Sequence, residues 1–334
     1  MDDLAGLPAI DGCLLDELAV RAHAIPQRIH RFFRERITGV GPGYWVMREA
    51  LTEHLTDRPT PGQHALQESL TQPELALIML STLLGEIFGW ATQQDGQLVH
   101  DIVPIRGKEQ DPTSACSQRA LTWHTEDAFH PFRADYLGLM CLRNSSATPT
   151  TVASFDDIRL TPEDLATLMQ PRYLILPDPS HTISAPWTTD DTAHDLPSVT
   201  SGGPVDHSYP APTSVLFGDP RRPFIRCDPD FTTVADRFDV EAARALEGLV
   251  SSLDNALTDV VLAPGDLLFI DNYRAIHGRR QFQPSYDGQG RWLKRVNITR
   301  DLRKMAVLGV AYDQRIVPST SPHSSSGETI GSPR

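Results

Sequence analysis

The chain has 334 residues, of which 40% are hydrophobic and 22% charged, a composition typical of a globular protein with a sizeable core. Its formal net charge of -13, with no basic cluster among aromatic residues, argues against a nucleic acid partner. The most apolar stretch, residues 75–90, is interrupted by Gly85 and Glu86 and is shorter than the roughly 20 apolar residues that span a bilayer. We therefore expect no membrane segment.

The cysteines and the first residues bear on the cellular compartment. The four cysteines lie far apart and form no CxxC pair, which argues against a zinc knuckle and a dense disulfide framework. Residues 1–13 open with acidic side chains where a signal peptide needs positive charge. These features predict a cytoplasmic protein. No coiled coil or long apolar edge is visible, so the oligomeric state stays open.

Apolar residues recur at helical spacing in 14–33 and again in 67–88, which predicts a helix in each segment. Thr71 is a candidate N-cap, and Glu74 three residues later is its capping-box partner. We therefore expect residues 1–95 to be mainly helical.

From about residue 98 the pattern changes to short apolar runs bounded by Pro, Gly, Asp and Asn, which are typical of strands. These runs are LVHDIVPI, YLGLMCL, RYLILP, TSVLFG, FIRCD, VVLAPGDLLFIDN and WLKRVNITRDL. One further amphipathic helix is predicted for 240–257. The sequence thus predicts a mainly β fold with flanking helices, organised as one domain over residues 1–317 with its β core at about 96–305.

Two segments lack this periodicity. Residues 177–212 are rich in Ser, Thr, Asp, Pro and Gly, and we expect a long surface loop or an active-site lid there. Residues 318–334 contain almost no large apolar side chains and are expected to be a disordered tail.

A candidate metal site begins in the string LTWHTEDAF. His124 and Glu126 are two residues apart, so on an extended strand their side chains point to the same face. A third ligand, His277, follows a run that is predicted to be a strand. Two imidazoles and one carboxylate occupy one face of an octahedral ferrous ion and leave three positions open, as oxygen chemistry requires.

These residues have other interpretations. An HxE pair alone occurs by chance on surface strands, and a His/His/Glu set also builds hydrolytic zinc sites. The zinc protease string HExxH is absent, however, and no spare general-base motif is present. A non-catalytic amino acid binding protein is a further alternative. His130, six residues after His124, is expected to be a loop residue rather than a ligand.

Three longer strings carry a resemblance to a known family. WHTEDAF, with FGWATQQDG before it and DNYRAIHGRRQFQPSYDGQGRWLKRVNITRDL after it, resembles the clavaminate synthase-like Fe(II)/2-oxoglutarate oxygenases, and among them the L-arginine β-hydroxylases. The resemblance covers about residues 85–302 and is poor in 177–212. It implies a double-stranded β-helix, or jelly-roll, core and iron ligands at His124, Glu126 and His277. A glutamate ligand departs from the aspartate of the wider superfamily, but this branch shares it.

The resemblance also implies how cosubstrate and substrate are held. Arg291 corresponds to the arginine that binds the distal carboxylate of 2-oxoglutarate, a task suited to a planar bidentate cation. Arg295, four residues later on the same predicted strand, corresponds to the arginine that meets the substrate α-carboxylate. Gln93, Ser114 and the outer part of Glu126 are the implied contacts of the α-amino group.

For the guanidinium end of a substrate, Asp228 and Asp230 in FIRCDPDF have period-two spacing and can face one side. Paired carboxylates suit a delocalised planar cation, although an acidic turn around Pro229 would give the same spacing. The implied reaction is hydroxylation of a free guanidino amino acid by O2 and 2-oxoglutarate, most closely that of L-arginine at C3.

The sequence leaves the outcome open in several respects. Relatives on the same scaffold attack C4, hydroxylate twice or desaturate, and homoarginine, enduracididine or capreomycidine-like substrates would offer the same guanidino group. Asparagine, the substrate of another branch, is disfavoured because two buried carboxylates would face a neutral amide. Members of this kind usually prepare unusual amino acids for peptide antibiotics, which is the role that the resemblance implies.

Overall fold

The structure is a computed structural model that describes residues 10–52, 55–62, 70–181, 211–311 and 313–318. The α-helices in these ranges are α1 (Gly12–Ala22), α2 (Gln27–Ile37), α3 (Gln72–Ser81), α4 (Pro162–Leu168) and α5 (Val240–Ala256). The 3-10 helices are η1 (Gln94–Gly96), η2 (Phe155–Asp157) and η3 (Leu302–Leu308). Within the described residues, no helix has the length and apolar character needed to cross a membrane.

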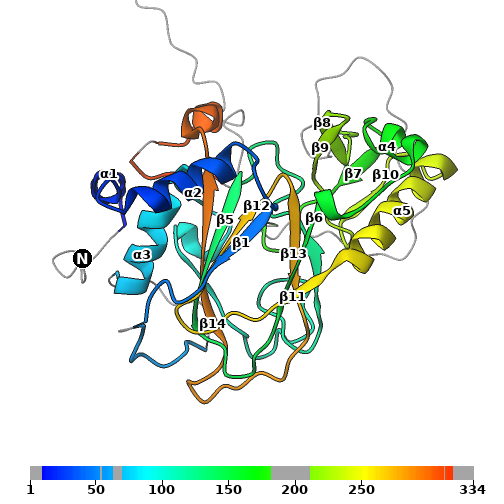
Figure 1. Ribbon diagram of the computed structural model, residues 1–334. Coiled ribbons are helices and arrows are strands. Elements are labelled where there is room, and N and C mark those ends of the chain that lie inside the picture. The colour runs from blue at the N-terminus through cyan, green and yellow to red at the C-terminus, as the bar shows by residue number, and fades with distance from the viewer. Residues whose placement is uncertain (1–9, 53–54, 63–69, 182–210, 312, 319–334) are drawn as a thin grey trace, which may run out of the picture.

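A large sheet forms one half of the β core. Its strand order is β1-β12-β5-β14-β2-β15, and β3 follows β2 along the same edge of β14. The strands are β1 (Tyr44–Met47), β2 (Glu86–Trp90), β3 (His100–Ile102), β5 (Tyr136–Arg143), β12 (Leu267–Asp271), β14 (Trp292–Thr299) and β15 (Ile316–Val317). Helices α1, α2 and α3 cover its outer face through one apolar cluster (Figure 1).

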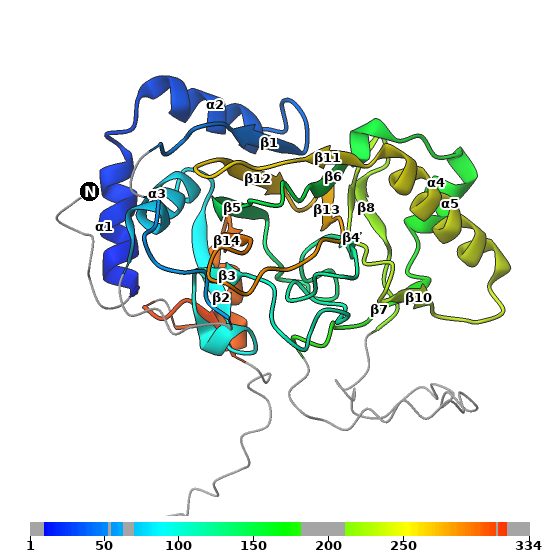
Figure 2. The ribbon, with the colours of Figure 1, turned by 90° about the horizontal axis from the view of Figure 1, so that it is seen from below.

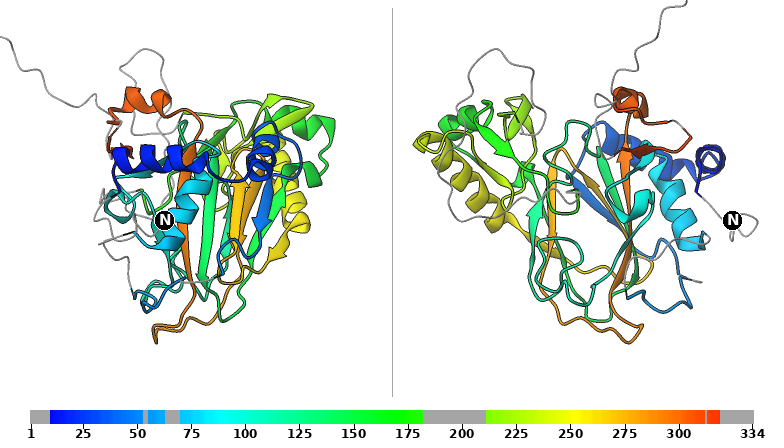
Figure 3. Two further views of the ribbon diagram at one scale, coloured as in Figure 1. Left: turned by 60° about the vertical axis from the view of Figure 1, so that its left-hand side comes forward. Right: turned by 180° about the vertical axis from the view of Figure 1, so that it is seen from behind.

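A smaller antiparallel sheet, ordered β11-β6-β13-β4, forms the other half. Its strands are β4 (Leu121–His124), β6 (Thr150–Ser154), β11 (Thr258–Val260) and β13 (Ala275–Arg279). Helices α4 and α5 flank it, together with the ribbons β7 (Tyr173–Ile175) with β10 (Thr232–Val234) and β8 (Leu216–Asp219) with β9 (Arg222–Ile225). Residues of both sheets line one cavity, so the sheets face each other across it (Figures 2 and 3).

Two helix predictions require correction. Residues 14–33 form two helices instead of one. Helix α1 ends at Ala22 and α2 begins at Gln27, because Pro26 disfavours a helical conformation in the residue ahead of it. The helix predicted for 67–88 ends at Ser81, and Glu86–Trp90 is strand β2, where pairing with β14 overrides local helix propensity. The first 95 residues therefore supply strands β1 and β2 of the large sheet as well as helices.

The predictions for β5, β12, β14 and α5 are confirmed. In FIRCD the strand ends at Ile225, so Asp228 lies beyond it. Of the predicted lid only 177–181 and 211–212 belong to the described residues, and the predicted tail lies outside them apart from Pro318.

A buried ion cluster joins β14 to α3 and β3. Lys294 Nζ lies 2.8 Å from Glu74 Oε1 and 2.6 Å from Asp101 Oδ1. Trp292 Nε1 donates a hydrogen bond of 2.6 Å to the same Asp101 oxygen. Glu74 Oε2 accepts a hydrogen bond from Thr71 N, as the predicted capping box requires. The start of α3 and the strand that leads into the cavity are thereby held together.

Candidate active site

Antiparallel pairing of two strands brings two imidazoles together. His277 of β13 stands directly opposite His124, the last residue of β4, and their ring centroids are 4.5 Å apart. Glu126 follows β4 by two residues, and its Oε2 lies 3.6 Å from His124 Nε2 and 3.4 Å from His277 Nε2. The three predicted ligands therefore converge on one point.

The donor atoms of this cluster fit a divalent metal ion. They lie within 4.8 Å of one another, and donors at right angles around an ion with bonds of about 2.1 Å are about 3 Å apart. Glu126 Oε2 is buried and has no hydrogen-bond partner among the described residues. His124 Nδ1 lies 2.9 Å from Thr122 O, which leaves Nε2 available for a metal. Two imidazoles and a carboxylate are the donor set of ferrous oxygenases.

Glu126 controls the charge of the cluster. Burial opposes its ionisation, but the Arg295 guanidinium and both imidazoles hold the pKa of Glu126 well below its usual range. Burial also opposes a charged His124, yet the adjacent Glu126 carboxylate and the charge of Asp228 raise its pKa to about 9. Burial and the adjacent His124 charge lower the pKa of His277 to about 4. His124 therefore tends to carry a proton, and a bound metal ion would take the place of that positive charge.

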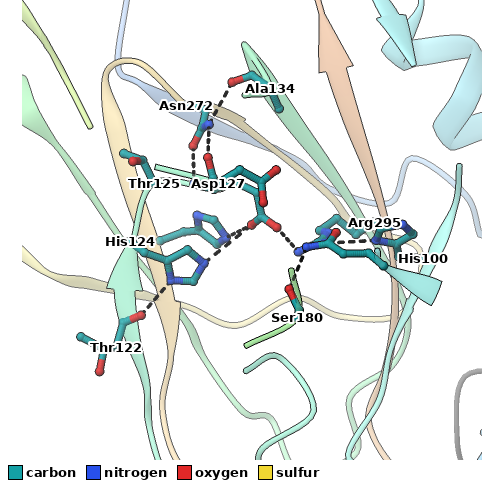
Figure 4. Close-up of polar contacts among 12 residues, drawn as sticks. His100, Thr122, His124, Thr125, Asp127, Ala134, Ser180, Asn272 and Arg295 are labelled. Carbon is teal, nitrogen blue, oxygen red and sulfur yellow. Dashed lines mark hydrogen bonds and ion pairs between the residues drawn. The ribbon is translucent and has the colours of Figure 1, made fainter. Parts of the chain in front are cut away.

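Asn272 braces the Glu126 backbone. Its Oδ1 accepts a hydrogen bond of 2.7 Å from Glu126 N, and its Nδ2 donates to Glu126 O at 3.0 Å and to Ala134 O at 2.9 Å (Figure 4). The side chain is fully buried, so its polar atoms depend on these partners. Asn272 was not predicted, since a single asparagine within FIDNY carries no spacing signal.

We expect Asn272→Ala to reduce the affinity for Fe(II) about 10- to 100-fold, the effect typical of removing a group that orients a ligand. The backbone of Glu126 would lose its partners, and the carboxylate would no longer be aimed at both imidazoles. Anaerobic titration with Fe(II) measures the change, with Asn255→Ala on the exposed face of α5 as the matched control. Equal iron affinity in Asn272→Ala and the wild type would contradict this role.

Arg295 connects the ligand cluster with the residues expected at the α-amino acid end. Its Nη1 contacts Glu126 Oε1, and its Nη2 lies 3.0 Å from Gln93 Oε1 and 2.9 Å from His100 Nδ1 (Figure 4). All four side chains are buried. The structure thus brings together three of the residues expected around the substrate α-carboxylate and α-amino groups, and it adds His100.

Arg291 is a buried guanidinium without a counter-anion in the part of the chain that the structure describes. It is 5% exposed, its Nη2 reaches Thr150 Oγ1 only at 3.5 Å, and its Nε has no hydrogen-bond partner there. Burial and the charge of nearby Arg279 lower the pKa of Arg291 to about 9. An unpaired buried charge is costly, so this wall of the cavity is suited to an anionic ligand.

The two aspartates expected to bind a guanidinium differ in their surroundings. Asp230 is exposed, and its Oδ2 forms an ion pair of 2.8 Å with Arg119 Nη2. Asp228 is partly buried and has no ion pair to another described residue, and burial raises its pKa to about 6. The carboxylate that remains available to a cationic ligand is therefore that of Asp228.

One cavity of about 370 Å³ contains this constellation, within the range of about 300–1,000 Å³ usual for small-molecule sites. The predicted site residues that line it are His124, Glu126, His277, Arg291, Gln93, Ser114, Asp228, Asp230 and Arg295. Arg279, Thr150, Asp178 and Ser180 also line it and were not predicted. Spacing could have identified Arg279, because it follows His277 by two residues on β13 and so shares its face.

A buried His–Asp pair holds the segment that carries Asp178 and Ser180. His181 Nε2 lies 2.8 Å from Asp127 Oδ1, and Trp90 Nε1 donates a hydrogen bond of 2.7 Å to Asp127 Oδ2.

The ring of His130 packs edge-on against Trp90, at 4.7 Å between centroids, and is not part of the ligand cluster.

Gly278 separates His277 from Arg279 where strands approach closely. A Cβ there would lie 2.6 Å from Leu121 O and 2.9 Å from Thr151 Oγ1. We expect Gly278→Ala to lower the free energy of unfolding by about 1–3 kcal/mol through overpacking. Urea denaturation measures the change. The control is Gly248→Ala in α5, where the nearest atom would be 3.8 Å away and no loss is expected. Wild-type stability in Gly278→Ala would show that the strands can part without cost.

Family comparison places this site in a known group of enzymes. The family described as taurine catabolism dioxygenase TauD, TfdA family, matches residues 67–297. The chain belongs to this dioxygenase family. The matched segment contains the whole ligand cluster together with Arg291 and Arg295.

Two relatives of the chain are named as hydroxylases of enduracididine and of L-ornithine or L-arginine. The chain is 38% identical over 307 residues to an enduracididine beta-hydroxylase of Streptomyces hygroscopicus, covering 90% of this dioxygenase and 89% of that protein. It is 39% identical over 247 residues to an L-ornithine/L-arginine 3-hydroxylase of Catenulispora acidiphila, covering 73% and 72%. The expected kinship with amino acid oxygenases is thereby confirmed.

Solved structures agree with this membership. The dioxygenase is similar to the non-heme iron oxygenase OrfP in a crystal structure with Fe, succinate and (3S)-hydroxy-L-Arg. The TM-score is 0.76 at 40% sequence identity, over 92% of this chain and 91% of that one. A further OrfP crystal structure contains Fe and alpha-ketoglutaric acid.

Proposed function

We propose that the protein is an Fe(II)- and 2-oxoglutarate-dependent hydroxylase of free L-arginine that acts at C3. The observation that carries the proposal is one cavity in which a His/Glu/His ligand cluster lies together with Arg291 and Asp228, neither of which forms an ion pair with another described residue. The relatives named for arginine and enduracididine hydroxylation support the same substrate class.

The proposal includes the expected double-stranded β-helix core. Two mainly antiparallel sheets that face each other across the cavity support it, as does the similarity to OrfP. We also retain a single domain over residues 1–317, since β1 and β2 from the first 95 residues pair within the large sheet.

Iron and 2-oxoglutarate, when bound, would activate O2, so that one of its oxygen atoms is inserted into a substrate C–H bond and the other enters succinate as 2-oxoglutarate loses CO2. The chain's own contribution is to bind and orient. His124, Glu126 and His277 would hold the iron on one face and leave the other positions open. Arg291 would bind the distal carboxylate of 2-oxoglutarate, with Thr150 Oγ1 beside it.

The α-amino acid end of the substrate would lie against the Arg295 network. The Arg295 guanidinium would bind the α-carboxylate. Gln93, Ser114 and Glu126 Oε1 would accept hydrogen bonds from the α-amino group. Glu126 would thus serve two purposes, because Oε2 faces the imidazoles and Oε1 faces Arg295.

The guanidinium end would be recognised by Asp228. Its carboxylate lacks an ion pair to any residue that the structure describes, whereas Asp230 already pairs with Arg119. A neutral amide such as asparagine would leave Asp228 without a counter-charge, which favours a guanidino substrate. With both ends bound, C3 is the carbon expected nearest the iron; attack at C4 or desaturation would require a displaced substrate.

A panel of substrates tests the proposed specificity. The purified protein is incubated in air with Fe(II), ascorbate, 2-oxoglutarate and one amino acid, and succinate formation is measured. We expect L-arginine to give the highest kcat/KM, ahead of homoarginine and enduracididine, and asparagine to give succinate at background. Greater turnover with asparagine than with arginine would contradict the proposal.

We place the enzyme in the cytoplasm as part of this proposal. Cys13, Cys116, Cys141 and Cys227 are all free, which agrees with a reducing compartment. The names of the relatives support a role in specialised amino acid biosynthesis, such as the preparation of building blocks for peptide antibiotics.

A further inference from the structure

Arg279 is a second buried guanidinium in the cavity wall. It is 4% exposed and forms no ion pair with any carboxylate of the described residues. Its Nη2 donates to Cys116 Sγ at 2.9 Å and to Arg119 O at 3.4 Å, and its Nη1 reaches Ser114 O at 3.5 Å. These acceptors are neutral and two of the bonds are long, so the positive charge of Arg279 is not compensated.

The same charge lies close to Arg291. The Cζ atoms of Arg279 and Arg291 are 4.9 Å and 6.0 Å from the centroid of the Phe282 ring, so both guanidinium groups lie near this ring, and the charge of Arg279 contributes to the lowered pKa of Arg291. Both arginines line the cavity. Like charges that share a buried site repel each other, and an anion between or beside them would relieve the repulsion. An aromatic ring with two cations nearby offsets only part of this cost.

We propose that Arg279 is a second cation of the cosubstrate pocket and selects a dicarboxylate by acting with Arg291 on its distal carboxylate. The inference rests on the proposed function, in which Arg291 holds that carboxylate. A 2-oxo acid that carries a methyl group in place of the distal carboxylate would leave two buried charges uncompensated. The pocket would therefore discriminate against monoanionic 2-oxo acids more strongly than a single arginine could.

A purely structural role is the alternative to be tested. Arg279 donates to the backbone of the segment that includes Ser114 and Arg119, and Arg119 in turn pairs with Asp230. If Arg279 only braced this segment, its loss would weaken L-arginine binding and would affect all 2-oxo acids equally.

Calorimetric titration of the Fe(II)-loaded full chain without O2 separates the two roles. The ligands are 2-oxoglutarate and 2-oxovalerate, which share the metal-binding end and differ in the distal carboxylate. We expect Arg279→Gln to weaken 2-oxoglutarate binding about tenfold, equivalent to about 1.4 kcal/mol, and to leave 2-oxovalerate binding unchanged. Arg279→Lys keeps the charge and should show a smaller loss with the same selectivity. The matched control is Arg280→Gln, the neighbouring arginine that pairs with exposed Asp259, and it should change neither affinity.

The selectivity between the two acids decides the result in whichever Arg279 variant folds. An equal loss for both acids, or no loss for 2-oxoglutarate, would overturn the role of Arg279 and leave the proposed function intact. A wild-type protein that binds no 2-oxoglutarate would overturn the cosubstrate assignment itself. Reduced L-arginine affinity together with unchanged 2-oxoglutarate affinity would assign Arg279 to the bracing role alone.

Discussion

Turnover of L-arginine by a His277→Ala variant is expected to fall by more than about 100-fold. Loss of a partner that only orients a ligand costs about 10- to 100-fold, so loss of a ligand itself should cost more. His277 Nε2 faces Glu126 Oε2 at 3.4 Å and pairs in register with His124, so no other described side chain can replace it in the cluster. Succinate release and Fe(II) titration measure the two consequences.

The control for this variant is His23→Ala, which removes an exposed histidine at the end of α1 and should leave both readings unchanged. Circular dichroism should show that His277→Ala is folded. If the wild type gave no succinate while both proteins bound L-arginine equally, the chain would be a non-catalytic binding protein. Full turnover in His277→Ala would show that the cluster is not the iron site.

The affinity for L-arginine is expected to fall about 10- to 100-fold in Asp228→Asn, because a hydrogen bond to a charged group contributes about 1.5–3 kcal/mol. Asp228 is partly buried and free of other ion pairs in the described residues, so the substrate guanidinium would lose its main counter-charge. The measurement is the Kd for L-arginine by anaerobic titration of the loaded enzyme.

Asp230→Asn is the matched comparison. Its carboxylate is exposed and already paired with Arg119, and exposed pairs contribute only about 0–1 kcal/mol, so we expect a change within about fivefold. If Asp230→Asn weakened arginine binding more than Asp228→Asn, the assignment of the guanidinium site to Asp228 would be wrong. Unchanged Kd in both variants would place the guanidinium elsewhere.

The ligand cluster and the main strands could be predicted from the sequence, because the residue spacing that indicates them is local. His124 and Glu126 are two residues apart at a strand end, and His277 follows an apolar run that forms β12. The capping box of Thr71 and Glu74 likewise lies within one turn and is present in the structure. Spacing of this kind fixes which face a side chain takes without reference to the rest of the chain.

Features that depend on distant partners could not be predicted. Residues 86–88 belong to a segment with helical spacing, and only pairing with β14 makes them part of strand β2. Asp228 and Asp230 look equivalent in the sequence, but an ion pair with Arg119 distinguishes them. The bracing role of Asn272 likewise depends on the approach of Glu126 from the distant segment that follows β4.

Reaction with L-arginine and 2-oxoglutarate under ¹⁸O₂, followed by mass spectrometry and NMR, tests whether the protein is an arginine C3 hydroxylase. We expect one labelled oxygen atom in hydroxyarginine, one in succinate, equal amounts of the two products, and the hydroxyl group on C3. Unchanged arginine with succinate at background would contradict the arginine hydroxylase assignment. A hydroxyl group on C4, or loss of two hydrogens, would contradict the proposed position of the substrate relative to His124, Glu126 and His277.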